Sequence, residues 1–260
     1  LELENDLRRA LERHELVQFY QPIIDIATGR IHGFEALVRW QHPSRGLVSP
    51  AEFIPVAEET GLITHVDWWA LQAACNQMSV WRAGFGEAAP QYVSVNMSSK
   101  QFMQRNILED VQSVIVETGL SPAALNLEIL ETVIMSDPDS VAKILGQLRQ
   151  VGVFLSIDDF GTGYSSLSYL HQFPIDIVKV DRSFVSKIGP GGENGAIVEA
   201  ILQLCRNLEL RVTAEGIEEA HQLAFLRELG CDYAQGFYFS KPVPANDATR
   251  LIEAGPWQIR

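Results

Sequence analysis

Short apolar runs alternate with amphipathic stretches along most of the chain. Between the later runs, apolar residues recur at the spacing of a helix with one buried face. Val141, Ile144, Leu145 and Leu148 repeat in this way, and Gly152 follows as an expected helix end. The runs that have the length of buried strands are residues 17–24, 31–40, 92–95, 125–127, 153–157, 175–178, 210–214 and 231–234. Strands in this number, separated by helices, predict a closed (β/α) barrel.

The first two runs are joined only by residues 25–30, which contain the turn-like pair Thr28-Gly29. A parallel crossover needs a dozen or more residues, so these two strands are predicted to be antiparallel. The expected fold is therefore α/β, a modified TIM (β/α)8 barrel with one antiparallel strand near the N-terminus. No interdomain linker is evident along the chain.

Helix start signals support this organisation. Ser49-Pro50-Ala51-Glu52 predicts a capping box that opens a helix ending near Gly61, and a longer helix is expected over about residues 64–81. Near the start, Leu3, Leu7 and Leu11 fall on one helical face, and the chain begins with Leu rather than Met. We expect residues 1–15 to form a linker helix that packs on the barrel or leads into it, and residues 16–260 to form one domain of a longer protein.

A polar residue follows most of the later runs, at the point where each predicted strand ends. These residues are Asn96, Glu128, Asp158, Lys179, Glu215 and Gln235. The carboxyl ends of barrel strands meet at one rim, where active sites of this fold lie. All but one of these groups offer oxygen to a hard cation, and Lys179 is itself a cation. The pattern predicts a site at this rim.

Two of the charged residues also have structural interpretations. Glu35 shares a strand face with Leu37 and Arg39, so it either meets a cation when buried or forms a surface pair with Arg39. Lys179 either lies beside phosphate or water, or forms a structural ion pair, since lysine is rarely interior without a partner.

Each of the remaining acids, taken singly, also has a structural interpretation. Glu128 and Glu131 flank a strand end and would also suit the first turn of a helix. Asp158-Asp159 opens a glycine-rich turn, where one aspartate could act as a helix cap. We expect the two aspartates to point to opposite sides, so that one bridges two metal ions and the other serves the second ion. The prediction that Glu215 is a site residue depends on its sharing the rim with these groups.

Composition narrows the class of protein. The chain has 260 residues, 47% of them hydrophobic, and a net charge of -13, which disfavours binding to DNA or RNA polymers. No apolar run approaches the ~18 residues of a membrane span, so no membrane contact is expected from this segment. Cys75, Cys205 and Cys231 lack CxxC pairing and are expected to be reduced thiols of a cytoplasmic protein. The histidines show no HxxxH spacing, which argues against zinc.

The motifs resemble those of one family. They are Glu-Ala-Leu-Val-Arg-Trp at 35–40, Val-Asn-Met-Ser at 95–98, Asp-Asp-Phe-Gly-Thr-Gly-Tyr-Ser-Ser-Leu at 158–167, Lys-Val-Asp at 179–181, Ala-Glu-Gly-Ile-Glu at 214–218 and Gln-Gly-Phe at 235–237. They resemble the EAL-domain phosphodiesterases, which hydrolyse cyclic di-GMP to linear 5′-pGpG. The resemblance extends from Tyr20 to Pro242 and implies the same modified barrel.

The resemblance implies roles by position. It implies two bound Mg²⁺ or Mn²⁺ ions, and Ca²⁺ is expected to bind without supporting catalysis. The implied metal ligands are Glu35, Asn96, Glu128, Asp158 and Asp159. The implied catalytic residues are Lys179 near the attacking water, Glu215 as base or water-mediated ligand, Gln235 ordering that water, and Glu131 holding the loop of residues 159–166. The implied substrate contacts are Gln21, Arg39, Asp181 and Glu218.

One departure and two rival functions remain open. Leu130 stands where the family usually has threonine, in Glu-Leu-Thr-Glu, which weakens the expected loop support. The chain could instead be a catalytically weak or inactive cyclic di-GMP receptor, or an unrelated metal-dependent barrel enzyme that uses Lys179 as a base. The resemblance further implies a homodimer through the 159–166 loop region and, if the chain is a fragment, an upstream sensor or GGDEF-type domain.

Overall fold

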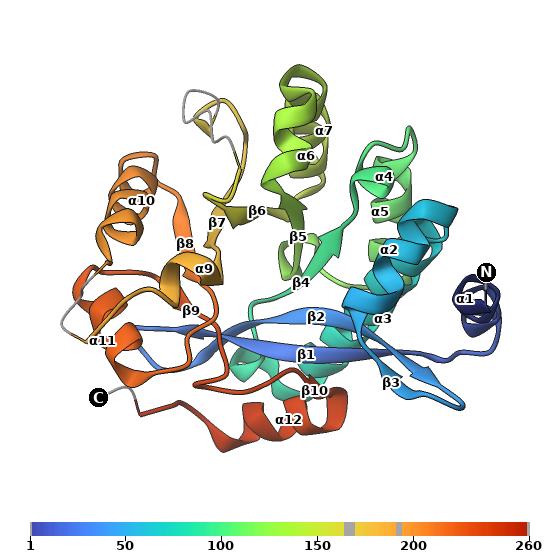
Figure 1. The fold of residues 1–260 in the computed structure, drawn as a ribbon, viewed down its shortest axis with the longest axis horizontal. Coiled ribbons are helices and arrows are strands. Elements are labelled where there is room, and N and C mark those ends of the chain that lie inside the picture. The colour runs from blue at the N-terminus through green and yellow to red at the C-terminus, as the bar shows by residue number, and fades with distance from the viewer. Residues whose placement is uncertain (1, 164–169, 191–193, 259–260) are drawn as a thin grey trace.

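The computed structural model describes residues 2–163, 170–190 and 194–258 of the chain. Within these ranges, eight strands close a ring in the order β1-β9-β8-β7-β6-β5-β4-β2, and β1 pairs with β2 to complete it. β3 and β10 lie outside the ring, on β2 and β1. Helices surround the strands, so the predicted barrel is confirmed (Figure 1).

One ring strand is reversed, as predicted. β1 runs antiparallel to β2 and to β9, whereas every neighbouring pair from β2 through β9 is parallel. The strands are β1 Leu16–Asp25, β2 Ile31–His42, β3 Gly46–Val48, β4 Tyr92–Met97, β5 Leu125–Leu130, β6 Phe154–Phe160, β7 Ile177–Val180, β8 Arg211–Ala214, β9 Tyr233–Ala234 and β10 Val243–Pro244. The carboxyl ends of the parallel strands therefore meet at one rim.

The predicted helices are present, with one error of detail. The helices are α1 Glu2–Glu12, α2 Pro50–Thr60, α3 Ile63–Phe85, α4 Ser99–Phe102, α5 Ile107–Thr118, α6 Glu131–Ser136, α7 Pro138–Val151, α9 Arg182–Val185, α10 Ala196–Asn207, α11 Ala220–Glu228 and α12 Ala245–Ala254. Ser49 occupies the N-cap of α2 and Gly61 ends it in the left-handed conformation, but the Ser49 side chain makes no cap hydrogen bond. The prediction of a capping box is therefore wrong, and the proline at the first helical position marks the start of α2 instead.

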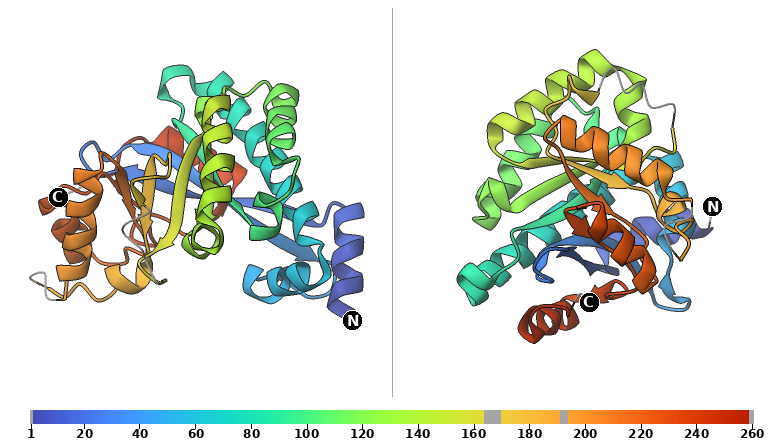
Figure 2. Two further views of the ribbon diagram at one scale, coloured as in Figure 1. Left: turned by 90° about the horizontal axis from the view of Figure 1, so that it is seen from above. Right: turned by 90° about the vertical axis from the view of Figure 1, so that its left-hand side faces the viewer.

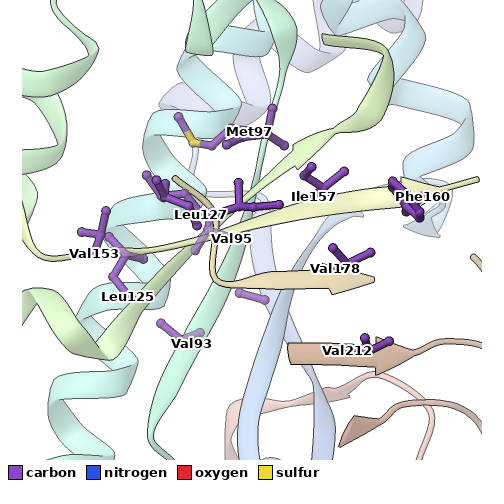
Figure 3. Close-up of a cluster of buried hydrophobic side chains, with 14 of the residues drawn as sticks. Val93, Val95, Met97, Leu125, Leu127, Val153, Ile157, Phe160, Val178 and Val212 are labelled. Atoms are coloured by element: carbon purple, nitrogen blue, oxygen red, sulfur yellow. The ribbon is translucent and has the colours of Figure 1, made fainter. Parts of the chain in front are cut away.

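The outer side of the ring strands carries the main hydrophobic core. Apolar residues of β4 through β8 gather there, among them Val95, Leu127 and Val178 (Figure 3). They pack against buried residues of the surrounding helices, such as Leu71 of α3 and Leu145 of α7. This arrangement explains why the strand runs read as apolar, since the outer face is covered by helices.

The inner side of the same strands is different. At the end opposite the site, Ile23, Tyr92 and Ile177 form a small buried apolar cluster with Phe154 and Tyr233. Above it, the inward residues are polar even though they are buried, including Ser94, Asn126 and Ser156. The barrel interior therefore changes from an apolar floor to a polar rim.

A second apolar cluster holds the N-terminal helix in place. Leu7 and Ala10 of α1 are fully buried beside Trp40 of β2 and Phe53 of α2. α1 lies at one edge of the molecule, far from α12 and the C-terminal segment (Figure 1 and Figure 2). Across the described ranges, no helix combines the length and apolar character needed to cross a membrane.

Candidate active site

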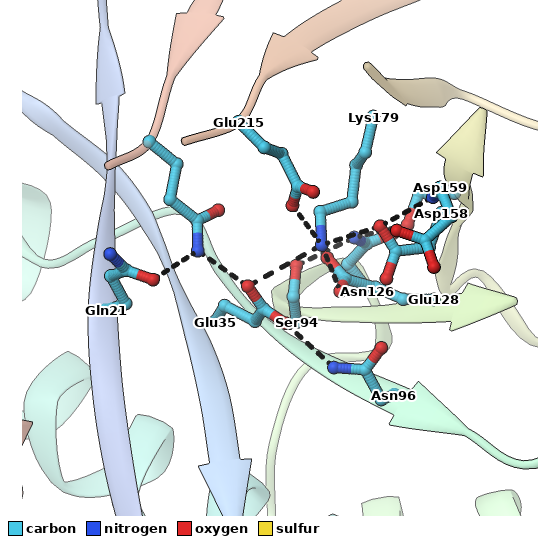
Figure 4. Close-up of polar contacts among 12 residues, drawn as sticks. Gln21, Glu35, Ser94, Asn96, Asn126, Glu128, Asp158, Asp159, Lys179 and Glu215 are labelled. Atoms are coloured by element: carbon cyan, nitrogen blue, oxygen red, sulfur yellow. Dashed lines mark hydrogen bonds and ion pairs between the residues drawn. The ribbon is translucent and has the colours of Figure 1, made fainter. Parts of the chain in front are cut away.

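The carboxyl ends of the ring strands surround a cavity of about 250 Å³. The predicted site residues that line it are Gln21, Glu35, Asp158, Asp159, Asp181, Glu215, Glu218 and Gln235. Asn96, Glu128 and Lys179 adjoin these residues through direct contacts. Figure 4 shows these three side chains converging with those of Glu35, Asp158 and Glu215 from separate segments of the chain. The structure therefore brings together groups that are far apart in sequence.

Lys179 is the centre of this group. The side chain is 2% exposed and comes from β7. In the ring β7 lies between β6, which carries Asp158, and β8, which Glu215 directly follows. Its Nζ atom lies 2.6 Å from Glu128 Oε2, 2.8 Å from Glu215 Oε1, 3.2 Å from Asp158 Oδ1 and 3.6 Å from Glu35 Oε2. One ammonium thus faces four carboxylates, which leaves the cluster with an excess of negative charge.

Glu35 is buried and held by amide donors. Asn96 Nδ2 donates to Glu35 Oε1 at 2.8 Å, and Gln235 Nε2 donates to Glu35 Oε2 at 2.6 Å. Gln235 Nε2 also donates to Gln21 Oε1 at 3.0 Å. With only 7% of Glu35 exposed, the alternative of a surface pair with Arg39 does not hold.

Asp158 and Asp159 both reach the cavity because the strand is irregular between them. The pairing of β6 with β7 shifts register between Ile157 and Phe160, and Asp159 has a φ of 55°. In a regular strand adjacent side chains point to opposite faces, and the prediction that Asp158 and Asp159 point to opposite sides assumes such a strand. The bulge changes this direction, so that carboxylate oxygens of Asp158, Asp159 and Glu215 lie within 4.8 Å of one another.

Glu131 lies at the base of the loop that follows Asp159. It is 2% exposed, begins α6, and its Oε2 accepts a hydrogen bond from the Gly161 backbone N–H at 2.8 Å. Gly163 also lies close to this carboxylate. Residues 164–166 of the predicted dimerisation and support loop lie outside the described residues.

The predicted substrate contacts differ in placement. Asp181 lines the cavity and also caps α9, because its Oδ1 accepts from the Ser183 backbone N–H at 3.0 Å. Glu218 lines the cavity beside the start of α11. Arg39 is not among the lining residues. Its guanidinium donates to the Val38 carbonyl at 2.8 Å and lies 5.6 Å from the centre of the Phe19 ring.

Burial and charge act against each other at the centre of the site. Burial works to lower the pKa of Lys179, but the charges of Asp158, Glu128 and Glu215 outweigh it and hold that pKa well above its usual range. Lys179 is therefore charged. Burial raises the pKa of Glu215 to about 8, against the opposing charge of Lys179 and with Asp158 adding to the increase.

The two innermost glutamates differ in their pKa. Burial alone would raise the pKa of Glu35, but Lys179 and the hydrogen bonds from Gln235 and Asn96 lower it. Burial raises the pKa of Glu128 well above its usual range, and Lys179 only partly offsets this. A cluster that resists full ionisation in this way is one that added cations would stabilise.

The donor set suits a hard divalent cation. Three carboxylates present oxygens within 4.8 Å of one another, and Glu128 Oε1 is buried without a hydrogen-bond partner in the described structure. A buried carboxylate oxygen without a donor is costly, and a metal ion would remove that cost. Carboxylate and amide oxygens favour Mg²⁺ or Mn²⁺ over softer metals.

Some residues that line the cavity are not predicted from the sequence. Arg182 and Phe237 line the cavity, and Phe237 remains 52% exposed with the Lys241 ammonium 5.4 Å from its ring centre. Arg182 directly follows Asp181 and Phe237 lies two residues after Gln235, and this proximity in the sequence was the available signal. The close approach of Gly216 to Arg182, with a φ of 71° at Gly216, also requires a residue without Cβ.

Nearly the whole chain is similar to known proteins of one family. The EAL domain family model matches residues 4–242. MucR of Pseudomonas aeruginosa, a bifunctional diguanylate cyclase/cyclic di-GMP phosphodiesterase, is 44% identical over 245 residues, which are 94% of this chain and 36% of MucR. The cyclic di-GMP phosphodiesterase NbdA of the same organism is 42% identical over 255 residues, 98% of this chain and 32% of NbdA. The chain spans about a third of the length of these relatives.

Solved structures show the same fold. The structure of the PaMucR phosphodiesterase in complex with c-di-GMP has a TM-score of 0.91 and 44% identity, and the match covers 95% of this chain and 100% of that one. The cGMP-bound EAL enzyme Bd1971 has a TM-score of 0.91 and 34% identity, covering 96% of this chain and 69% of that one.

Proposed function

Because the chain belongs to the EAL domain family, we propose that it is a metal-dependent phosphodiesterase that hydrolyses cyclic di-GMP to linear 5′-pGpG. The single observation that supports this most strongly is the cluster of Lys179 with four buried carboxylates at the rim of the barrel. The similarity to MucR and NbdA, both named for activity on cyclic di-GMP, supports the substrate.

The proposed ligands of two Mg²⁺ or Mn²⁺ ions are Glu35, Asn96, Glu128, Asp158 and Asp159. When bound, the ions would activate water as Lewis acids and stabilise charge on the attacking and leaving oxygens. Glu215 shares a compact oxygen cluster with Asp158 and Asp159, which suits either direct or water-mediated ligation. Ca²⁺ is expected to bind with looser geometry and to support little turnover.

The chain's own groups would then orient and deprotonate the attacking water. Gln235 Oε1 is buried and, in the described structure, has no hydrogen-bond partner, so it is available to accept a hydrogen from that water. Lys179 would hold the oxygen of the water through its ammonium, and Glu215 would take its proton. Attack on phosphorus opposite the 3′ oxygen would form a new P–O bond and break the bond to that oxygen. The 3′ oxygen would leave with a proton supplied by solvent, and Glu215 would return its proton to solvent.

Substrate would be held around the cavity mouth. Gln21, Asp181 and Glu218 line the cavity and offer acceptors and amide donors to the nucleotide. Arg39 would have to release its hydrogen bond to the Val38 carbonyl to reach a phosphate. Glu131 would support the loop after Asp159 through the Gly161 N–H.

The assembly around this domain is part of the same proposal. We propose that residues 1–15 connect to an upstream sensor or GGDEF-type domain, since relatives are about three times longer. A homodimer through the 159–166 loop region is likewise proposed.

The test is hydrolysis of cyclic di-GMP by the purified chain with Mg²⁺, Mn²⁺ or Ca²⁺, followed by chromatography. We expect 5′-pGpG with the first two metals, and loss of turnover by roughly 10³-fold or more in Glu35→Ala, because a metal ligand and the acceptor of two amide hydrogen bonds are lost. Exposed Glu253→Gln on α12 is the matched carboxylate control and should leave turnover unchanged.

Binding measured by calorimetry on the same sample separates the two rival functions. Nucleotide binding without product under all metal conditions would assign the receptor function instead. Wild-type turnover in Glu35→Ala would refute the proposed site.

A further inference from the structure

A layer of three buried polar side chains lies inside the barrel beneath the proposed metal ligands. Ser94 on β4, Asn126 on β5 and Ser156 on β6 are each no more than 1% exposed. Each precedes a proposed ligand by two residues on its own strand, in the pairs Ser94–Asn96, Asn126–Glu128 and Ser156–Asp158. Alternate residues of a strand face the same side, so each pair shares the inner face of the barrel.

Asn126 connects the three strands. Its Nδ2 atom donates to Ser94 Oγ at 2.8 Å on one side (Figure 4). On the other side it donates to Ser156 Oγ at 3.0 Å. A primary amide carries two hydrogens on one nitrogen, so a single short side chain reaches both neighbours. An isosteric aspartate has no amide hydrogen to donate, and an aliphatic residue has neither a donor nor an acceptor.

This layer is not arranged for maximum stability. Asn126 Oδ1 is buried without a hydrogen-bond partner in the described structure, and such a group costs about 1–3 kcal/mol. An apolar layer of similar volume would avoid that cost. The hydrogen bonds instead fix the positions of β4, β5 and β6 relative to one another, at the level where their next inward residues must converge.

We propose that Asn126 is a positioning residue that sets the relative placement of Asn96, Glu128 and Asp158 for divalent-metal binding. The inference rests on the proposed function. Metal ligation tolerates errors of only about 0.2 Å in ligand distance, so strands that shift slightly against one another lose affinity before they lose the fold.

The test compares Mn²⁺ binding with stability in metal-free protein. Asn126→Val removes the link alone, and the triple change Ser94→Ala, Asn126→Val, Ser156→Ala converts the whole layer to apolar residues without stranded hydroxyls. We expect both to bind Mn²⁺ about 10-fold or more weakly by calorimetry, with a broadened Mn²⁺ EPR spectrum. The triple variant should melt at the wild-type temperature or above.

Thr213→Val is the matched control. Thr213 is 1% exposed and precedes Glu215 by two residues, but its hydroxyl links no strands within the described chain. It should bind Mn²⁺ as the wild type does. If Asn126→Val does not fold, the triple variant alone decides.

The outcomes are distinct. A wild-type chain that binds no Mn²⁺ overturns the proposed function together with this inference. A wild-type chain that binds Mn²⁺, with unchanged affinity in the triple variant, overturns the inference alone. An equal loss in Thr213→Val, or a loss matched by a fall in the triple variant's melting temperature, would also overturn it, since either indicates a general effect on the fold.

Discussion

The outer and inner sides of the same barrel strands follow opposite rules. On β5, Leu125 and Leu127 face outward into the main hydrophobic core, whereas Asn126 and Glu128 alternate with them and face inward. All four are 1% exposed or less. Equal burial therefore carries different chemistry on the two sides.

The difference lies in how specific the partners are. Outward residues gain stability from area and packing, which many apolar neighbours supply together. Inward charges depend on single partners, because a buried ion that loses its counter-ion is strongly destabilising. Lys179 is the extreme case, since one ammonium serves four carboxylates. Stability therefore depends on the outer side as a whole and on a few individual residues of the inner side.

Removing the Lys179 ammonium should destabilise the buried charges on the inner side of the barrel. We expect Lys179→Met to lower the free energy of unfolding of metal-free protein by about 3–5 kcal/mol, because Glu35, Glu128, Asp158 and Glu215 lose their shared counter-ion. Mg²⁺ or Mn²⁺ should restore more stability to this variant than to the wild type. Urea unfolding in chelator and in metal measures both effects.

Leu127→Ala is the outer-side control for this experiment. It should cost about 2–5 kcal/mol through a cavity in the core, and metal should restore no more stability to it than to the wild type. Equal metal dependence in Lys179→Met and Leu127→Ala would contradict the distinction between the two sides.

Asp67 is a buried acid on the helix side of the ring, outside the cluster around Lys179. It lies on α3, is 8% exposed, and accepts a hydrogen bond from the Ser98 backbone N–H at 3.1 Å. Burial raises its pKa from 3.8 to about 6, the Ser98 hydrogen bond opposes this, and the charge of Glu58 adds to it. No ion-pair partner of Asp67 is found within the described ranges.

A raised pKa of this kind makes stability fall as pH rises. The folded protein retains a proton that the unfolded chain releases near pH 3.8, so the contribution is complete below that pH and is lost as pH rises through about 6. Asp67→Asn keeps an acceptor for Ser98 and should remove this loss, with a gain on the order of 2–3 kcal/mol at pH 8 and little change near pH 4. Urea unfolding across this range measures it.

Exposed Glu253→Gln is the control for Asp67→Asn and should show no such pH-dependent gain. A gain in Asp67→Asn that is equal at pH 4 and pH 8 would contradict the assignment of the effect to Asp67 ionisation.

Local patterns predicted most of the fold. The strand runs, the short link that reverses β1, and the helix end at Gly152 are properties of a few consecutive residues, and the structure bears them out. The polar strand ends also predicted which groups would meet, because the barrel rule brings carboxyl ends to one rim.

Contacts across strands could not be predicted in this way. The bulge that turns Asp159 into the cavity depends on the register of β6 against β7. The link from Asn126 to Ser94 and Ser156 depends on the stagger of three strands, and nothing in the local sequence of Asn126 distinguishes it from an exposed residue. The contact of the Arg39 guanidinium with the Phe19 ring of β1 is likewise a contact between strands, which the local motif around Arg39 does not predict.

The smallest expected effect on stability is at Leu130, where β5 ends and α6 begins. It occupies the N-cap of α6, its side chain makes no cap hydrogen bond, and it is 37% exposed. Leu130→Thr should supply the missing cap and stabilise the chain by about 1 kcal/mol, a rise of about 2–4 °C in melting temperature. Leu130→Ala removes the exposed leucine without adding a cap and is the matched control. Equal melting temperatures for the two variants would show that the departure from the family pattern at this position has no capping consequence.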